Sequence, residues 1–409
     1  MFIADFHIHS RFSRATSSEM NIPQLVRWAK KKGINLVGTG DFTHHLWLQE
    51  IKNNLERAEK EGFLVREGVY FILSVEVSNI FSQNNRSYRV HNVIMAPSLK
   101  VAGEINRMLS FYGNLASDGR PILSMSCQRL AEELFKISPQ IMLIPAHIWT
   151  PWYSLFGSNS GFNSLEEAFG KYTDKITALE TGLSSDPPMN WRWSALDNFA
   201  LVSNSDAHSP SRLGREANVF STYLNYWQIK EALEKKDKEK FLFTIEMFPQ
   251  EGKYHYDGHR NCNIRLSPAQ RKEYRGICPV CGRPLTVGVL SRVEELGDRA
   301  EGFMPPGSID YRSLIPLDEI IAEARGVKKG SRQVERQYEE IISDVGAEIK
   351  ILLQLEREKL FSCLPAKVAE GILRVRERKV KIKPGFDGEY GEIGIFDEEE
   401  ENKQQMSLF

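Results

Sequence analysis

The first ten residues, Met1-Phe-Ile-Ala-Asp-Phe-His-Ile-His-Ser10, organise the prediction of the fold. An apolar run leads into His7-x-His9, and residues two positions apart in a β-strand lie on the same face. Two imidazoles presented together at the end of a strand can bind one cation. A His-x-His pair is common by chance, so its meaning depends on whether the same pattern recurs along the chain.

The pattern recurs within residues 1–228, where apolar segments alternate with helical ones. We expect strands at 2–8, 33–41, 69–77, 87–97, 140–147, 175–182 and 199–205. Strands that alternate with helices are parallel and are joined by right-handed crossovers. Seven such strands predict an α/β fold built on a distorted (β/α)7 barrel, whose functional groups gather at the C-terminal ends of the strands.

Ligand-type side chains end or follow these strands, and one more lies inside the fourth strand. They are His7, His9, Asp41, Glu76, His147, Asp206 and His208, with His91 as the internal one. Each histidine alone is more often a core or surface residue, but the set exceeds what one tetrahedral zinc needs. It predicts two or three metals bridged by Glu76 or Asp206, a cluster that hydrolyses phosphate esters by activating water. Arg11 and Arg14 follow the first motif and are candidate phosphate clamps.

These motifs resemble those of the PHP (polymerase and histidinol phosphatase) superfamily, which implies a distorted seven-stranded barrel with up to three metals. The resemblance assigns His7, His9, Glu76 and Asp206 to the first metal, Glu76, His91 and His147 to another, and His208 to the remaining site. The sequence departs from the superfamily pattern at that remaining site. Ser13-Arg-Ala-Thr16 and Phe42 stand where histidines are usual, and Asp41, His44 or His45 are the candidate substitutes.

Residues 229–310 predict a small zinc-binding module. The spacing His-x2-Cys-x15-Cys-x2-Cys lets two close pairs face one tetrahedral Zn²⁺. The predicted ligands are His259, Cys262, Cys278 and Cys281, with His255 as the alternative to His259. Four protein ligands leave no open position, so this site is structural. Residues 287–292 predict a strand in this module.

The rest of the chain predicts a basic helical domain over 311–385 and an acidic tail over 386–409. A solvated helical bundle and a solvating acidic run are the alternative interpretations. The final five residues, Gln405, Met406, Ser407, Leu408 and Phe409, resemble a peptide that binds the DNA sliding clamp. A terminal position after a flexible spacer suits such a ligand.

The composition narrows the class of protein. The 409 residues carry a net charge of −1, 41% apolar residues and 10% aromatic residues, which suffices for a packed core. The five cysteines are an odd number, and no signal peptide or membrane-length apolar run is present. These features predict a cytoplasmic protein, free of membranes, whose cysteines bind metal.

The arrangement as a whole resembles endonuclease Q, through segments 4–14, 38–44, 259–281, 292–296 and 385–388. The resemblance implies a DNA-repair enzyme that cuts 5′ of deaminated bases (hypoxanthine, uracil, xanthine) and abasic sites with metal-activated water. It implies Zn²⁺ in the structural site and the cluster, with Mg²⁺ or Mn²⁺ as alternatives in the cluster. The candidate catalytic residues are Asp206, Glu76, Arg11 and Arg14, and the damaged nucleotide is expected to flip into a pocket near 149–162.

Two other functions remain open from the sequence. One is a small-molecule phosphatase or a DNA exonuclease on the same barrel, which leaves the zinc module and the basic helices without a role. The other is a non-enzymatic, clamp-bound DNA-binding adaptor with a degenerate site. Internal nicking of a damaged duplex excludes the first, and a metal content above one zinc per chain excludes the second.

Overall fold

The N-terminal stretch forms β1 (Phe2–Asp5), which is buried along its whole length in the large sheet. The computed structural model describes residues 1–58 and 61–396. β1 pairs in parallel with β2 (Leu36–Gly38) and antiparallel with β11 (Ala217–Phe220). Beyond β11 the sheet continues to β12 (Phe241–Glu246) and β15 (Asp310–Ser313), so it extends past residue 228. The four-part division of the chain stays a prediction.

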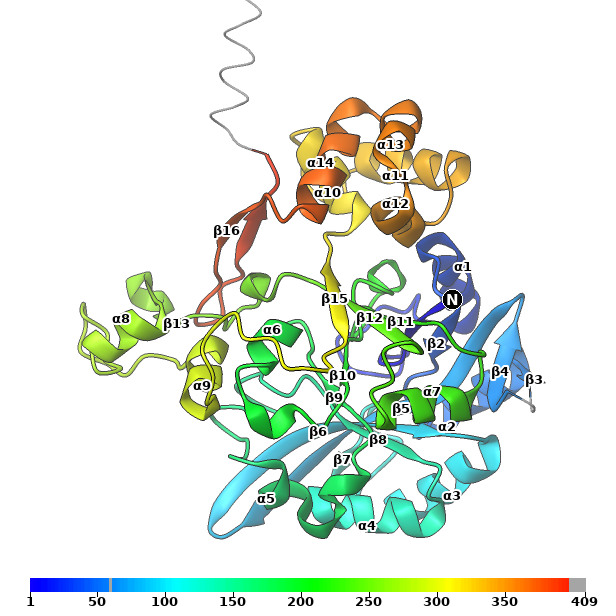
Figure 1. Cartoon of the computed structure of the whole chain (residues 1–409). Helices are drawn as coiled ribbons and strands as arrows, with labels where there is room; N and C mark the ends of the chain where they lie inside the picture. The colour runs from blue at the N-terminus through cyan, green and yellow to red at the C-terminus, as the bar shows by residue number, and fades with distance from the viewer. Residues whose placement is uncertain (59–60, 397–409) are drawn as a thin grey trace, which may run out of the picture.

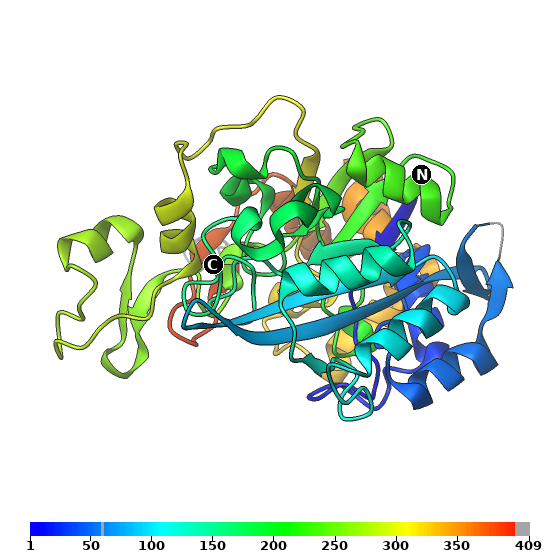
Figure 2. The same cartoon turned by 90° about the horizontal axis from the view of Figure 1, so that it is seen from below.

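A long hairpin crosses the other half of the molecule (Figure 2). β5 (Val69–Gln83) is parallel to β2, whereas β6 (Arg86–Ala96) runs antiparallel to β5. This corrects the expectation that the predicted strands are all parallel. Asn84 and Asn85 join the two strands with φ of 51° and 59°, the backbone that a two-residue hairpin turn requires and that asparagine tolerates.

The last strands come together at the far side of this hairpin. β8 (Met142–Pro145) pairs antiparallel with β6, and β9 (Leu179–Glu180) pairs in parallel with β10 (Leu201–Val202). Backbone hydrogen bonds from Ile148 N to Glu180 O and from His9 N to Ala207 O connect these elements to their neighbours. The mixed α/β class is confirmed. The closed seven-stranded barrel stays a prediction, because regular strand pairing is not continuous between β8 and β9 or between β10 and β1.

Helices pack on the outside of the strands (Figure 1). α1 begins after Asn21, whose side chain accepts a hydrogen bond from Gln24 N, and it ends at Gly33 with φ 85°. The helices of this part are α1 (Ile22–Lys32), α2 (His45–Asn54), α3 (Leu99–Leu109), α4 (Cys127–Ile137), α5 (Leu165–Phe169), α6 (Pro187–Asn190) and α7 (Tyr226–Glu234). The remaining short strands are β3 (Glu56–Ala58), β4 (Phe63–Arg66) and β7 (Ile122–Leu123).

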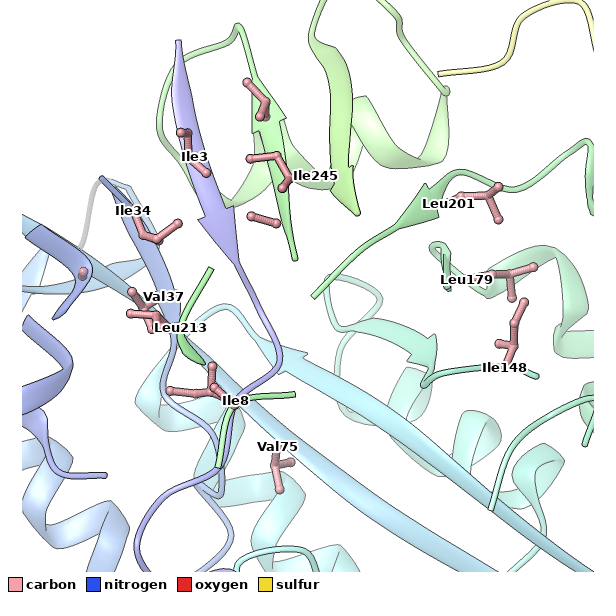
Figure 3. Close-up of a cluster of buried hydrophobic side chains, with 14 of the residues drawn as sticks. Ile3, Ile8, Ile34, Val37, Val75, Ile148, Leu179, Leu201, Leu213 and Ile245 are labelled. Carbon is pink, nitrogen blue, oxygen red and sulfur yellow. The ribbon is translucent and has the colours of Figure 1, made fainter. Parts of the chain in front are cut away.

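Branched aliphatic side chains fill the space between the strands (Figure 3). Those labelled in Figure 3 come from segments far apart in the chain and include Ile3, Val37, Val75, Leu179, Leu201 and Ile245. Burial of each such side chain stabilises the fold by about 1.5–3 kcal/mol. This core holds the strand ends in place, and the polar residues that follow the strands project from it.

A helical bundle forms the C-terminal part, as predicted. It consists of α10 (Leu317–Ala324), α11 (Arg332–Asp344), α12 (Glu348–Gln354), α13 (Arg357–Cys363) and α14 (Ala366–Arg376). The bundle contacts α1 through a buried ion pair between Lys32 Nζ and Glu348, 2.6 Å apart. Tyr338 donates a hydrogen bond to the same carboxylate at 2.7 Å.

The cysteine-containing module projects from the side of the molecule (Figures 1 and 2). Its elements are β13 (Asp257–His259), β14 (Ile264–Leu266), α8 (Pro268–Glu273) and α9 (Val289–Leu296). The strand predicted at 287–292 is wrong, because α9 buries Val289 and Val293 at helical spacing. β16 (Lys381–Lys383) and β17 (Glu392–Gly394) form a hairpin near the end of the described chain.

Among the helices that the structure describes, none combines the length and the apolar character that a membrane crossing needs. The predicted clamp peptide, residues 405–409, and the acidic run 397–401 lie outside the described residues.

Candidate metal centre

The strand ends deliver the predicted ligands to one place with an unusual backbone. Asp41, His147 and Asp206 adopt left-handed φ values of 47°, 31° and 45°. A non-glycine residue in this region costs on the order of 1–3 kcal/mol and persists only where the surroundings impose it. The strain therefore marks the ends of β2, β8 and β10 as places where side-chain direction matters more than local stability.

Glu76, on β5, is the centre of the arrangement. Its Oε1 lies 2.7 Å from His91 Nδ1 and 3.0 Å from His147 Nε2. Its Oε2 lies 3.2 Å from His9 Nε2 and 3.6 Å from His7 Nε2. One buried carboxylate thus faces two pairs of imidazoles, the geometry expected of a ligand that bridges two metal ions.

Asp206 and His208 form a third group with His9. Asp206 Oδ1 lies 3.1 Å from His9 Nε2 and 3.6 Å from His208 Nδ1. The three groups with metal-binding distances are His7, His9 and Glu76; Glu76, His91 and His147; and His9, Asp206 and His208. Glu76 and His9 each belong to two groups, so the three form one continuous centre.

Several donor atoms in this centre are buried without a hydrogen-bond partner among the described residues. They are Nε2 of His7, Nε2 of His9 and Oδ1 of Asp206. A buried polar atom without a partner costs about 1–3 kcal/mol. Nitrogen and oxygen donors that converge in this way fit cations, because a bound ion satisfies all of them at once.

Carboxylates behind the histidines orient the rings. Glu180 contacts His7 Nδ1 at 3.0 Å and accepts a hydrogen bond from His147 N at 2.8 Å. Asp41 contacts His9 Nδ1 at 3.2 Å and accepts hydrogen bonds from Ser10 and Ser13. A carboxylate on the far nitrogen fixes the tautomer and direction of a metal-binding imidazole.

Two predicted ligands therefore lie outside the three groups. Asp41 has its two oxygens engaged by His9 and the serines, so it orients a ligand instead of binding metal. His44 stacks on Phe12, with ring centroids 4.5 Å apart, and on His45 at 5.1 Å. His44 is the residue that precedes α2 and is in none of the three groups.

The protonation states follow from burial and from these neighbours. Burial lowers the pKa of His7, but Glu180 and Glu76 outweigh it and raise that pKa well above its ordinary value. Burial raises the pKa of Glu76, but His91, Arg120 and His7 outweigh it and hold that pKa well below its ordinary value. Burial lowers the pKa of His91 to about 4. Glu76 and His91 are therefore already in forms that bind metal, whereas a cation bound by His7 would displace the proton of its imidazolium.

Arg11 and Arg14 have ion-pair partners in the structure, and their role as phosphate clamps stays a prediction. Arg11 pairs with Glu50 at 2.6 Å, and Arg14, with 83% of its side chain exposed, pairs with Asp118 at 3.3 Å. Neither ion pair involves a carboxylate of the centre. Arg120 instead places Nη1 3.0 Å from Glu76 Oε2. Arg120 lies in a loop before a two-residue strand, where nothing in the sequence pattern indicated a site.

The cysteine module holds a separate group of ligands. His259, Cys262, Cys278 and Cys281 lie within metal-binding distance of one another. His259 Nδ1 is 3.5 Å from Cys281 Sγ, whereas His255 is buried and stacks on Tyr256 outside this group. Asn263 and Gly282 take φ of 51° and 73°, which form the tight turns beside Cys262 and Cys281. The structure thus places His259, and not His255, in the group that could hold a metal ion.

Comparison with solved structures identifies the family. The crystal structure of the lesion-specific endonuclease PfuEndoQ from Pyrococcus furiosus gives a TM-score of 0.87 at 33% identity, covering 98% of both chains. The chain belongs to the endonuclease Q family. A second structure, an endonuclease Q complex with a 27-mer duplex that carries an abasic lesion at the active site, gives a TM-score of 0.85 at 33% identity and covers 97% of both chains.

The helical bundle of this endonuclease Q family member also matches a protein-family model. Residues 316–379 match the family described as the MJ0043 C-terminal domain. The MJ0043 protein of Methanocaldococcus jannaschii is 38% identical over 258 residues, which are 60% of this chain and 31% of that protein. The aligned part of the chain thus spans about a third of the length of this relative.

The aromatic segment after His147 is mostly core in this endonuclease Q family member. Trp149, Phe156 and Phe162 are buried, and Trp149 Nε1 donates to Asn190 Oδ1 at 2.8 Å. These rings are unavailable to stack on a base, so the predicted pocket near 149–162 needs other residues. Trp152 is the exposed ring of the segment and contacts Tyr254 edge to face at 5.3 Å.

Proposed function

We propose that this chain is a metal-dependent DNA-repair endonuclease that hydrolyses the phosphodiester on the 5′ side of a damaged nucleotide. The observation that carries the proposal is the position of Glu76 between two pairs of imidazoles, with unpartnered donor atoms of His7, His9 and Asp206 directed at the same space. Membership of the endonuclease Q family and the abasic duplex bound by one relative support DNA damage as the substrate class.

The three ligand groups of the centre would hold the ions. Five of the seven candidate ligands are histidines, a donor set that suits Zn²⁺ better than Mg²⁺ or Mn²⁺. Bound ions supply a water of lowered pKa and neutralise charge on the phosphate. We assign a structural Zn²⁺ to His259, Cys262, Cys278 and Cys281, since four protein ligands leave no open position.

The chain's own residues orient the reaction. Asp206 Oδ1 is buried without a hydrogen-bond partner, and burial, which raises its pKa, is outweighed by His9 and His7, which hold that pKa far below its ordinary value. Its carboxylate is therefore ionised and can orient the attacking water. The water oxygen bonds to phosphorus, the bond from phosphorus to the 3′ oxygen breaks, and the products are a 3′-hydroxyl and a 5′-phosphate.

The decisive experiment uses an end-labelled duplex with one internal abasic-site analogue, beside the undamaged duplex of the same sequence. We expect one internal nick 5′ of the lesion with the wild type, and none with Asp206→Ala. Shortening from the ends contradicts the proposal and favours an exonuclease. Duplexes that carry single uracil, hypoxanthine or xanthine bases test the proposed range of deaminated substrates.

We also propose that residues 405–409 bind the DNA sliding clamp and that the protein acts in the cytoplasm. The support is the sequence Gln405-Met-Ser-Leu-Phe409 after an acidic spacer, and the odd number of cysteines. A chain that ends at Gln404 should lose co-elution with the clamp while it nicks a short duplex at the wild-type rate. Equal co-elution of both chains contradicts the clamp proposal.

A further inference from the structure

One guanidinium reaches the metal centre from the solvent side. Arg120 Nη1 lies 3.0 Å from Glu76 Oε2, and 26% of the Arg120 side chain is exposed. The ligands beneath it, His7, His9 and Glu76, are buried. Arg120 therefore lies between the innermost ligands and the solvent from which a substrate arrives.

The loop that carries Arg120 is held by the same residues that orient His9. Gly119 N donates to Phe12 O at 3.0 Å. A Cβ on Gly119 would lie 2.2 Å from Asp41 Oδ2 and 2.4 Å from Ser13 Oγ, so any larger residue would displace this loop. Arg120 N donates to Asp118 Oδ1 at 3.1 Å. This packing fixes the position of the guanidinium relative to the ligands.

Arg120 differs in this respect from the two arginines that the motif suggested. Arg11 and Arg14 form ion pairs with Glu50 and Asp118, neither of which belongs to the three ligand groups. Arg120 also has a favourable electrostatic interaction with Asp206. Its guanidinium thus lies close to carboxylates from all three ligand groups.

A guanidinium at this place needs a new anionic partner once the centre is loaded. Cations bound by Glu76 neutralise the carboxylate and repel the guanidinium. Arginine has five N–H donors in a planar fork that matches two oxygens of a phosphate. Glu76 is the hydrogen-bond acceptor of its side chain among the described residues, which leaves further donors for a substrate.

We propose that Arg120 is a catalytic residue that binds the non-bridging oxygens of the scissile phosphate and stabilises the charge that develops on them. This inference rests on the proposed function, because it assigns a role within phosphodiester hydrolysis. No bond is made or broken at Arg120. Its contribution is a fixed positive charge beside the non-bridging oxygens, which carry the negative charge of the pentacoordinate transition state.

The test compares Arg120→Gln and Arg120→Lys with Arg11→Gln, Arg14→Gln and the distant surface control Arg129→Gln. Arg129 lies on α4 and pairs with Glu132 and Glu133 of the same helix. Three quantities are measured: the single-turnover rate on the abasic duplex at saturating metal, the metal content per chain, and the affinity for the intact duplex in the presence of a chelator.

We expect Arg120→Gln to lower the single-turnover rate by about 10²–10³-fold, as the loss of one fixed donor to a transition state does. Metal content and chelated-duplex affinity should stay within about twofold of wild type, and added guanidinium ion should restore part of the rate. Arg120→Lys should keep the positive charge but lose the planar set of N–H donors. Its single-turnover rate should therefore lie between those of Arg120→Gln and the wild type. The Arg129→Gln variant should nick within about fivefold of wild type, and Arg11→Gln and Arg14→Gln should lose less of the rate than Arg120→Gln does.

A wild-type rate for Arg120→Gln, or a loss of rate in proportion to a loss of metal, overturns the proposal, because the arginine then only holds Glu76. A larger loss in Arg11→Gln or Arg14→Gln also overturns it. If the proposed function itself is wrong, the wild type leaves the duplex intact. The same variants are then compared for their rates of hydrolysis of bis(4-nitrophenyl) phosphate. A metal-loaded wild type that hydrolyses neither substrate overturns both proposals.

Discussion

The two metal-binding regions of this protein are built in opposite ways. The histidine and carboxylate centre takes ligands from His7 to His208, and most of them are buried in a large hydrophobic core. The cysteine module takes its ligands from residues 259–281, and its own buried core is Leu266, Cys278 and Leu285. In the first region the fold positions the ligands. In the second region we expect a bound metal to contribute to folding, because so small a core cannot do so alone.

The largest expected effect is loss of the fold of the second region, the cysteine module. Cys278→Ser should remove one zinc per chain and unfold the module, since zinc in such sites contributes on the order of 10–16 kcal/mol of folding free energy. Limited proteolysis should then cut within 255–285 while the remainder of the chain stays resistant. Cys127→Ser, at a buried cysteine outside both regions, is the control. An intact module in the zinc-free variant would refute the contrast.

The next largest effect is loss of activity at the first region without unfolding of the chain. Asp206→Asn should lower the nicking rate by on the order of 10³-fold or more, because weakened metal binding removes several kcal/mol of transition-state stabilisation. The thermal midpoint of the metal-free chain should fall slightly, because His9 and His7 stabilise the ionised Asp206 carboxylate in the folded state. A drop in the midpoint with unchanged nicking would contradict the assignment.

A smaller effect is expected at Glu180, which orients a histidine of the first region. It tests whether such orienting carboxylates affect metal binding in that region and not in the cysteine module. Glu180→Gln should weaken metal binding or activity by about 10–100-fold, because His7 loses the carboxylate that fixes its tautomer. Metal affinity of the centre, measured by competition with a chelator dye, reports this loss. The zinc of the cysteine module serves as the internal reference and should bind as in wild type.

The smallest expected effect is a difference in pH dependence between the stability of the large sheet and zinc retention by the cysteine module. Burial raises the pKa of Glu246 to about 8, against an unfolded value near 4.5, so the folded state binds one more proton between these values. Stability of the sheet should therefore fall as pH rises, by about 1 kcal/mol between pH 6 and pH 7. Glu246→Gln should flatten this slope in thermal melts. Zinc retention by the cysteine module should change in the opposite direction, because acid protonates its ligands.

The sequence alone indicated which residues would meet but less about how they are held. His-x-His at a strand end and the spacing of the cysteines are local patterns, so they predict ligands without knowledge of the fold. The orienting role of Asp41 was not predictable, because it depends on the hydrogen bonds from Ser10 and Ser13 in the folded chain. Asn84-Asn85 did signal a hairpin, and the expectation of uniform parallel strands overlooked it.

Chain order and residue type thus determined the α/β class, the helical C-terminal part, and which cysteines, histidines and carboxylates come close together, because periodicity and spacing are properties of the chain itself. Tertiary structure alone decided that Arg120 contacts Glu76, that Glu180 orients His7, and that Arg11 and Arg14 pair elsewhere. The physical reason is distance along the chain: Glu180 lies 173 residues from His7, and Arg120 lies 44 residues from Glu76. Side chains so far apart come into contact only through the packing of the core, and no local pattern records that contact.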